Sequence, residues 1–149
     1  HLGDFRAALA DYQRALAYAP NHREVLLEVA ELYRATKQPD RALAALQRLA
    51  DTYPPGEEPA EVLYLQGLTY SELGRYQEAA EQLALAVQRA GASADWLYQL
   101  AQAQAAAGQW VQADQSLRQA LALDPTHRGS RELLSRLESL RAVQNPLPR

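Results

Sequence analysis

The stretch from Ala60 to Ser93 decides the fold: it reads AEVLYLQGLTYSELGRYQEAAEQLALAVQRAGAS and contains two amphipathic runs. In the first run, small and large apolar residues share one face at the i, i+4, i+7 spacing of a helix: Leu63, Gly67 and Tyr70. The second run has the same helical spacing: Ala79, Leu83, Ala86 and Val87. Gly74 lies between the runs, where a glycine ends a helix in the left-handed conformation. Two short helices bury too little surface to be stable alone, so this unit needs copies beside it.

Copies of this unit fill the rest of the chain. The expected parts are a half repeat with the second helix only (2–21), three complete repeats (23–56, 60–93 and 94–127), a C-terminal capping helix (128–143) and a tail (144–149). Together they predict a single all-α domain over residues 1–149. Because the chain begins inside the pattern, we expect it to be part of a longer protein.

The recurring residues predict how the helices pack. One position of the second run is alanine in every copy: Ala8, Ala42, Ala79 and Ala113. A facing position of the first run is also small: Ala30, Gly67 and Ala101. Small side chains at both positions allow two helices to approach closely. An aromatic residue after the turn is expected to fill the gap there: Phe5, Tyr76 and Trp110. The copy at 23–56 departs most, because Lys37 replaces the turn glycine and Pro39 the aromatic residue.

The repeat length and these positions resemble the tetratricopeptide repeat, whose pattern is W-x₂-L-G-x₂-Y…A-x₃-F…P over 34 residues. The pattern occurs three times here: Leu26-x₂-Val29-Ala30-x₂-Tyr33…Ala42-x₃-Leu46…Pro54, Leu63-x₂-Gln66-Gly67-x₂-Tyr70…Ala79-x₃-Leu83, and Leu97-x₂-Leu100-Ala101…Ala113-x₃-Leu117…Pro125. The resemblance covers residues 2–143 and implies a right-handed superhelix of helix–turn–helix repeats. It identifies a scaffold, which by itself specifies no function.

The resemblance also implies a binding surface, because the first helix of each repeat in this family lines a concave groove that receives partner peptides. The corresponding residues here are Glu24, Leu27, Glu28, Glu31, Arg34, Glu61, Tyr64, Leu65, Leu68, Glu72, Asp95, Tyr98, Gln99 and Gln102. Tyr64 and Leu68 lie on the opposite side of their helix from Gly67 and Tyr70. We therefore expect Tyr64, Leu65 and Leu68 to be free of packing duties and available to a ligand.

The charges of this groove predict the kind of partner. Six carboxylates oppose the single base Arg34: Glu24, Glu28, Glu31, Glu61, Glu72 and Asp95. Some family members hold the C-terminal carboxylate of a chaperone with Lys, Asn and Arg at this surface. The matching positions here are Leu27, Glu28, Glu31, Leu65 and Gln99, so that clamp is absent. We expect a partner with Lys or Arg beside an apolar anchor. The same acidic residues are also compatible with a merely solvated face.

Composition limits the other functions. The formal net charge of −3 gives no general attraction to nucleic acid or to an anionic membrane. No apolar run is long enough to span a membrane. The absence of cysteine excludes disulfides, and it favours a reducing cytoplasm without excluding the periplasm. The bias towards Ala, Leu, Arg and Gln is typical of a bacterial protein from GC-rich coding.

Catalytic, metal and cofactor motifs are missing from the sequence. The three histidines form no HExxH or i, i+4 pair, and the glycines occur singly at turns rather than in a phosphate-binding loop. We expect His22 and His127 to cap helices, and Trp96 to be partly buried between helices. No serine has a nearby His/Asp companion in sequence. We therefore predict no enzyme activity, no catalytic residue, no metal and no cofactor.

Three functional hypotheses follow from the sequence. The first is a non-catalytic scaffold that binds a partner peptide in the groove. The second is a structural or docking array within a larger multidomain protein, whose other domains include an enzyme. The third is self-association through the N-terminal helix at residues 3–19, whose apolar face lacks a partner helix. The sequence names no partner and no pathway.

Overall fold

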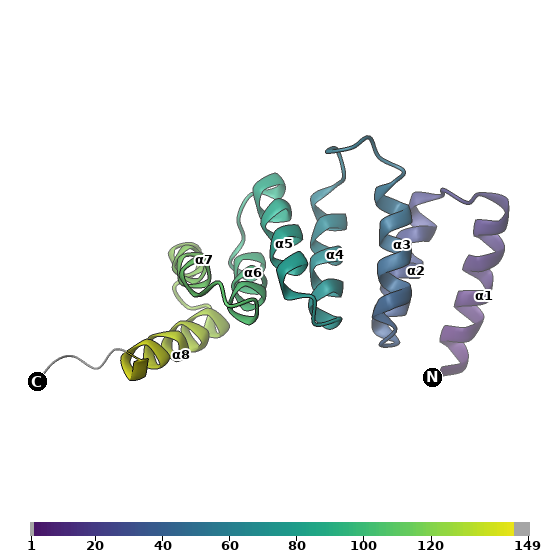
Figure 1. Ribbon diagram of the computed structural model, residues 1–149. Helices are drawn as coiled ribbons and strands as arrows, with labels where there is room; N and C mark the ends of the chain where they lie inside the picture. The colour runs from purple at the N-terminus through teal and green to yellow at the C-terminus, as the bar shows by residue number, and fades with distance from the viewer. Residues whose placement is uncertain (1, 145–149) are drawn as a thin grey trace, which may run out of the picture.

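Residues 2–144 are described by the computed structural model, and their regular structure is entirely α-helical (Figure 1). The helices are α1 (Leu2–Tyr18), α2 (Arg23–Ala35), α3 (Pro39–Ala50), α4 (Ala60–Glu72), α5 (Tyr76–Ala90), α6 (Ala94–Ala106), α7 (Trp110–Leu123) and α8 (Arg128–Gln144). They stack in chain order, with α1 and α8 at opposite ends of the array (Figure 1). This confirms the predicted all-α superhelical array. Gln144, expected in the tail, is the last residue of α8, and 145–149 lie outside the described residues.

Two layers result from the alternation of first and second helices. Consecutive helices pack together, and in addition the first helices touch their own kind, α4 against α6 and α6 against α8. Among residues 2–144, no two second helices are in comparable contact. The first helices therefore lie on the inner, shorter side of the curved array, and the second helices lie on its outer side.

The three turns inside the repeats share one geometry. Each has a residue with positive φ that follows the first helix: Lys37 at 56°, Gly74 at 73° and Gly108 at 78°. In each turn the next N–H donates to a carbonyl five residues back, as Arg75 N–H does to Tyr70 at 2.9 Å. This is the Schellman geometry, which satisfies the last carbonyls of the helix. Lys37 adopts it although its Cβ makes the left-handed conformation unfavourable.

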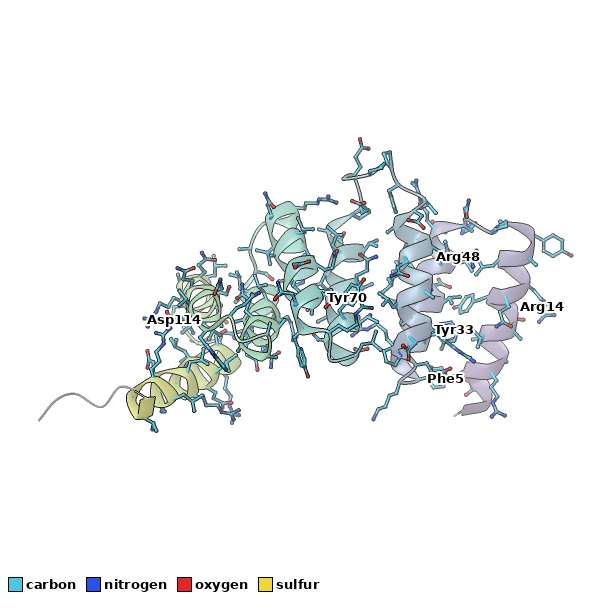
Figure 2. The ribbon with its side chains drawn as sticks, in the orientation of Figure 1. Phe5, Arg14, Tyr33, Arg48, Tyr70 and Asp114 are labelled. Carbon is cyan, nitrogen blue, oxygen red and sulfur yellow. The ribbon has the colours of Figure 1, made fainter. Side chains whose placement is uncertain are left out.

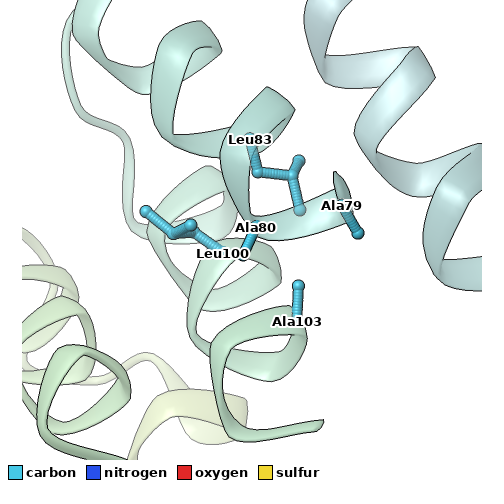
Figure 3. Packing of buried hydrophobic residues seen from close by; sticks show 5 residues of the cluster. All are labelled: Ala79, Ala80, Leu83, Leu100 and Ala103. Atoms are coloured by element: carbon cyan, nitrogen blue, oxygen red, sulfur yellow. The ribbon is translucent and has the colours of Figure 1, made fainter. Parts of the chain in front are cut away.

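Small residues pack the helices at close range. Ala79 and Leu83 of α5 are fully buried, and Figure 3 shows both beside residues of α6. A Cβ on Gly67 of α4 would lie 2.5 Å from Cγ of Leu83, so only glycine fits at this crossing. The predicted close approach of the helices is confirmed there.

Two further details of the repeats differ from expectation or refine it. The aromatic residues after the turns fill the gap only in part, because Phe5 and Tyr76 are each 40% exposed and Trp110 is 50% exposed. Pro39 is the first residue of α3, where its missing N–H leaves no carbonyl unpaired.

The loop between the second and third repeat units is anchored at both ends. Arg23 of α2 donates to the hydroxyl of Thr52 at 2.9 Å, and its guanidinium lies 3.9 Å from the ring centre of Tyr53. Arg89 of α5 pairs with the carboxylate of Glu58 at 3.0 Å. The prolines stiffen the segment between these anchors. The loop therefore joins two repeats as a fixed surface connection.

Candidate functional site

The fourteen predicted groove residues all lie on the inner helices α2, α4 and α6. None of them is fully buried. Seven are exposed: Glu24, Glu28, Glu31, Glu61, Glu72, Asp95 and Gln102. Seven are half-buried: Leu27, Arg34, Tyr64, Leu65, Leu68, Tyr98 and Gln99. The exposed positions are polar and the half-buried positions are mostly apolar, so the surface has a recessed apolar centre with polar edges.

An aromatic platform forms the middle of this surface. The ring of Tyr64 on α4 stacks on the ring of Trp96 on α6, with 4.3 Å between ring centroids and 7° between planes. Burial raises the pKa of the Tyr64 hydroxyl; the negative charge of Asp95 raises it further and Arg34 opposes the change. Trp96 is half-buried between helices, as expected, but sequence reasoning left it out of the groove. The signal was available, because Trp96 follows Tyr64 by nearly one repeat length and so lies beside it on the next first helix.

The expectation that the apolar groove residues are free of packing duties is wrong. Leu65 packs against the buried cluster that contains Val29 and Leu46, in the preceding repeat. Tyr64 and Leu68 pack against the cluster of α5 and α6 residues drawn in Figure 3. One side of each residue thus contributes to the contact between repeats, because inner helices in a curved stack are close together. Only the other side is left for a ligand.

The charges of the surface are also less one-sided in its middle than the sequence suggests. Both Nε and a terminal nitrogen of Arg34 donate to one carboxylate oxygen of Glu72, at 3.1 and 2.6 Å. Arg34 and Glu72 therefore neutralise one another across α2 and α4. The carboxylates on α2 remain, and Glu28 accepts a hydrogen bond from the Tyr12 hydroxyl, which raises the pKa of Tyr12. Negative charge is consequently concentrated at the α2 end of the surface.

Tyr98 and Gln102 have a structural role at the other end. The amide of Gln102 donates to the Tyr98 hydroxyl at 2.9 Å. The Tyr98 ring covers Gly129 of α8 so closely that a Cβ there would lie 2.8 Å from Cζ of the ring. Helix α8 therefore covers much of Tyr98, and this part of the predicted groove offers less apolar surface than the platform.

A Ser–His–Asp arrangement occurs at the start of α8. His127 Nε2 lies 3.0 Å from Asp95, and Nδ1 lies 2.8 Å from the Ser130 hydroxyl. The backbone N–H of Ser130 also donates to Nδ1 at 3.1 Å, so Nδ1 is an acceptor and the ring proton belongs on Nε2, facing Asp95. Ser130 is completely buried, and no substrate can reach its hydroxyl. The arrangement caps a helix, which was the expected role of His127.

His22 has the same capping role at α2, where its Nδ1 accepts a long hydrogen bond of 3.5 Å from the backbone of Val25. Within residues 2–144, no three His, Asp or Glu side chains are grouped so that they could hold a metal ion. None of the described helices is long and apolar enough to cross a membrane.

Comparison with known proteins now identifies the architecture. The family model of the tetratricopeptide repeat matches residues 1–67 and 70–137, which is most of the chain. The chain belongs to the tetratricopeptide repeat family. A search of curated proteins found no match to the sequence.

Several solved tetratricopeptide repeat structures superpose on the chain. The crystal structure of MamA has a TM-score of 0.87 and 21% identity, over 95% of this chain and 81% of that one. MamA 41-end from Desulfovibrio magneticus RS-1 has a TM-score of 0.85 and 19% identity, over 93% and 77%. The second repeat domain of human RPAP3, in complex with the HSP70 peptide SGPTIEEVD, has a TM-score of 0.69 and 16% identity, over 78% and 98%. At these identities the likeness concerns the fold alone.

Proposed function

We propose that this tetratricopeptide repeat array is a non-catalytic module that binds a peptide segment of a partner protein along the inner surface of α2, α4 and α6. The observation that carries the proposal is the Tyr64–Trp96 platform, a half-buried aromatic pair at the centre of that surface. Aromatic side chains of this kind are common anchors of protein interfaces, because they offer a large contact area at a small entropic cost. The solved complex of human RPAP3 with an HSP70 peptide supports peptide binding as a use of this fold.

The polarity of the surface favours a partner with basic residues next to an apolar one. Glu24, Glu28 and Glu31 are exposed on α2, while the one arginine of the surface is paired with Glu72. A basic side chain would therefore gain attraction at the α2 end, while its apolar neighbour rests on the platform. The HSP70 peptide SGPTIEEVD is acidic at its C-terminal end, and the family's carboxylate clamp is absent here. We expect this chain to reject that peptide.

Fluorescence offers a direct test. The chain contains two tryptophans, so Trp110→Phe leaves Trp96 as the only reporter. Synthetic peptides that combine Arg or Lys with Leu or Phe should change the Trp96 emission saturably, and SGPTIEEVD should not. Tyr64→Ala should weaken peptide binding at least about tenfold, the effect of losing a central aromatic anchor.

The matched control is Tyr76→Ala, because Tyr76 is a partly exposed tyrosine on α5, a second helix away from the platform. It should leave affinity unchanged. Tyr98→Ala is a poor probe of binding, since Tyr98 also supports α8 at Gly129. Equal affinity of the Tyr64→Ala and unchanged chains would contradict the proposed site. No binding by any basic–apolar peptide would favour the alternative of a docking array within a larger protein.

A further inference from the structure

The two ends of the array have unpartnered faces of different kinds. In α3, α5 and α7 one alanine is completely buried under the first helix of its own repeat: Ala42, Ala79 and Ala113. The equivalent Ala8 of α1 is only half-buried, because no first helix lies against that face in the part of the chain that the structure describes. Tyr12, which takes the position of the fully buried Leu83, is half-buried as well. Helix α1 thus has a ready docking face for a first helix.

This face continues into an acidic cleft between α1 and α2. The cleft has a volume of about 560 Å³, and its floor includes Phe5, Ala8 and Leu32. Its rim has three carboxylates, Asp4, Glu28 and Glu31, and no basic residue lines it. Within residues 2–144, neither Glu28 nor Glu31 belongs to a salt bridge. An occupant of the cleft should therefore be a helix with a small residue and positive charge on the contacting side.

The outer face of α8 has those properties. Its exposed residues are Arg128, Arg131, Ser135, Arg136 and Ser139, interrupted by Glu132, which pairs with Arg128. Ser135 follows Ala101 by one repeat length of 34 residues, so it takes the small position that Gly67 and Ala101 have in complete repeats. Arg131 and Arg136 belong to no salt bridge among the described residues. In chain position α8 is a first helix, and the structure shows no second helix against its outer face.

We propose that the chain associates head to tail with a second copy of itself, with α8 of one copy docked on α1 and α2 of the next. The two helices would form a composite repeat, in which α8 is the first helix and the neighbouring copy's α1 is the second. Ser135 then faces Ala8 and Tyr12, as Gly67 faces Ala79 and Leu83 within one chain. The proposal does not depend on peptide binding at the Tyr64–Trp96 platform.

Charge complementarity supports this pairing. Neighbouring first helices exchange charged contacts along the inner surface, as Arg34 of α2 does with Glu72 of α4. Arg136 occupies the repeat position of Glu31, so in the composite repeat it would lie opposite Glu28 and Glu31 on the adjacent first helix. Asp11 and Glu138 would also approach one another. Each already has an arginine partner, Arg14 and Arg118 respectively, which offsets their repulsion.

The symmetry of the contact predicts the form of the assembly. The two contacting surfaces are different and lie at opposite ends of the array (Figure 1). Such a heterologous contact leaves each added copy with a free end, so association continues instead of closing as a dimer. The average mass should therefore increase steadily with concentration and decrease when salt screens the charges.

Sedimentation equilibrium of the 149-residue chain, from micromolar to millimolar concentration, tests the proposal with two charge-reversed variants. Arg131→Glu with Arg136→Glu makes α8 acidic, and Glu28→Arg with Glu31→Arg makes the cleft basic. Each variant alone should associate at least about tenfold more weakly than the unchanged chain, since like charges then meet. An equimolar mixture should regain association, because every contact between the two variants is again complementary.

The control has the same change of net charge as the α8 variant but places it on the outer helices: Gln47→Glu, Gln88→Glu, Gln115→Glu and Gln119→Glu, all at exposed positions. It should associate as the unchanged chain does. Circular dichroism of each variant confirms that it is folded. The proposal is overturned by an unchanged chain that stays monomeric over the whole range, by association that stops at a dimer, or by association that survives both charge reversals.

Discussion

The repeat made by α2 and α3 and the repeat made by α4 and α5 share one backbone but differ at the residues that should specify it. Lys37 stands at the turn of the first and Gly74 at the turn of the second, yet both have positive φ and the same pair of turn hydrogen bonds. The N–H after the turn donates at 2.8 Å in one repeat and 2.9 Å in the other. Packing between repeats therefore enforces the turn even where the local sequence opposes it.

The facing small residue distinguishes the same two repeats in the opposite sense. Ala30 is fully buried, so the α2–α3 contact accommodates its methyl group. Gly67 has no room for one, since a Cβ would lie 2.5 Å from Cγ of Leu83. The α4–α5 pair is thus the tighter contact, with a favourable turn, and α2–α3 is looser, with a strained turn. The four predictions below test this difference, beginning with the largest effect.

Enlarging the alanine of the second helix should reveal the tighter contact most strongly. Ala79→Leu should lower the free energy of unfolding by about 3 kcal/mol, because the added atoms meet Gly67 in a contact without free space. Ala42→Leu, the same change in the looser repeat, should cost about 2 kcal/mol. Urea unfolding of both variants measures the difference. An unchanged stability of Ala79→Leu would disprove the close approach.

Adding one methyl group to the first helix should also distinguish the repeats. Gly67→Ala should destabilise the chain by about 1 kcal/mol, even though alanine is intrinsically the better helix former, because Leu83 is buried and must shift. The control is Gly3→Ala in α1, where a Cβ meets nothing within 4 Å. That variant should be slightly more stable than the unchanged chain in thermal unfolding. A gain in stability from both changes would show that Leu83 adapts without cost.

Relieving the turn of the looser repeat should increase stability. Lys37→Gly should raise the free energy of unfolding by about 0.5–1 kcal/mol, since glycine adopts positive φ without the penalty of a Cβ. Lys37→Ala keeps the Cβ and removes only the long charged side chain, so it should give no such gain. If both substitutions stabilise the chain equally, the lysine charge rather than the backbone is responsible. Chemical denaturation resolves effects of this size when the variants are measured in parallel.

The fold could be predicted from the sequence because each repeat states the same pattern independently. Positions such as Leu26, Leu63 and Leu97 recur at helical spacing and are all buried. Recurrence makes one irregular copy harmless, so Lys37 and Pro39 did not obscure the repeat of which they are part. What recurrence cannot indicate is how polar replacements are accommodated. Gln104 stands where other copies have tyrosine, and only the structure shows it buried and bonded to the Ser116 hydroxyl at 2.8 Å.

The candidate site could be predicted only as a face of three helices. Which helix side faces inward follows from periodicity, and the fourteen residues do lie on the inner helices. The use of each residue depends on its neighbours in the next repeat, which periodicity within one helix does not specify. For this reason the stacking of Trp96 on Tyr64 and the pairing of Arg34 with Glu72 were not foreseen. Contacts between copies, rather than within them, determine the chemistry of the surface.

The loop between the two compared repeats provides the smallest effect, because its anchors are single surface contacts. Arg23 fixes the loop to the first repeat, and the Arg89–Glu58 pair fixes it to the second. Hydrogen bonding from its own backbone N–H lowers the pKa of Glu58 below the ordinary 4.5; burial opposes this change and Arg89 adds to it. A carboxyl group with a lowered pKa stabilises the fold above its unfolded-state pKa and loses that contribution as the pH falls through its folded-state pKa.

Glu58→Gln should therefore destabilise the chain at pH 7 by about 0.5 kcal/mol, the scale of a partly exposed ion pair. The difference from the unchanged chain should shrink as the pH falls below the ordinary 4.5 of Glu58, since both side chains are then neutral. Glu57→Gln is the matched control, because Glu57 is exposed and belongs to no salt bridge among the described residues. Urea unfolding at neutral and acidic pH compares the three proteins. If the Glu58→Gln deficit were the same at both pH values, it would come from lost packing, and the loop would be held to the second repeat by contacts other than its charge.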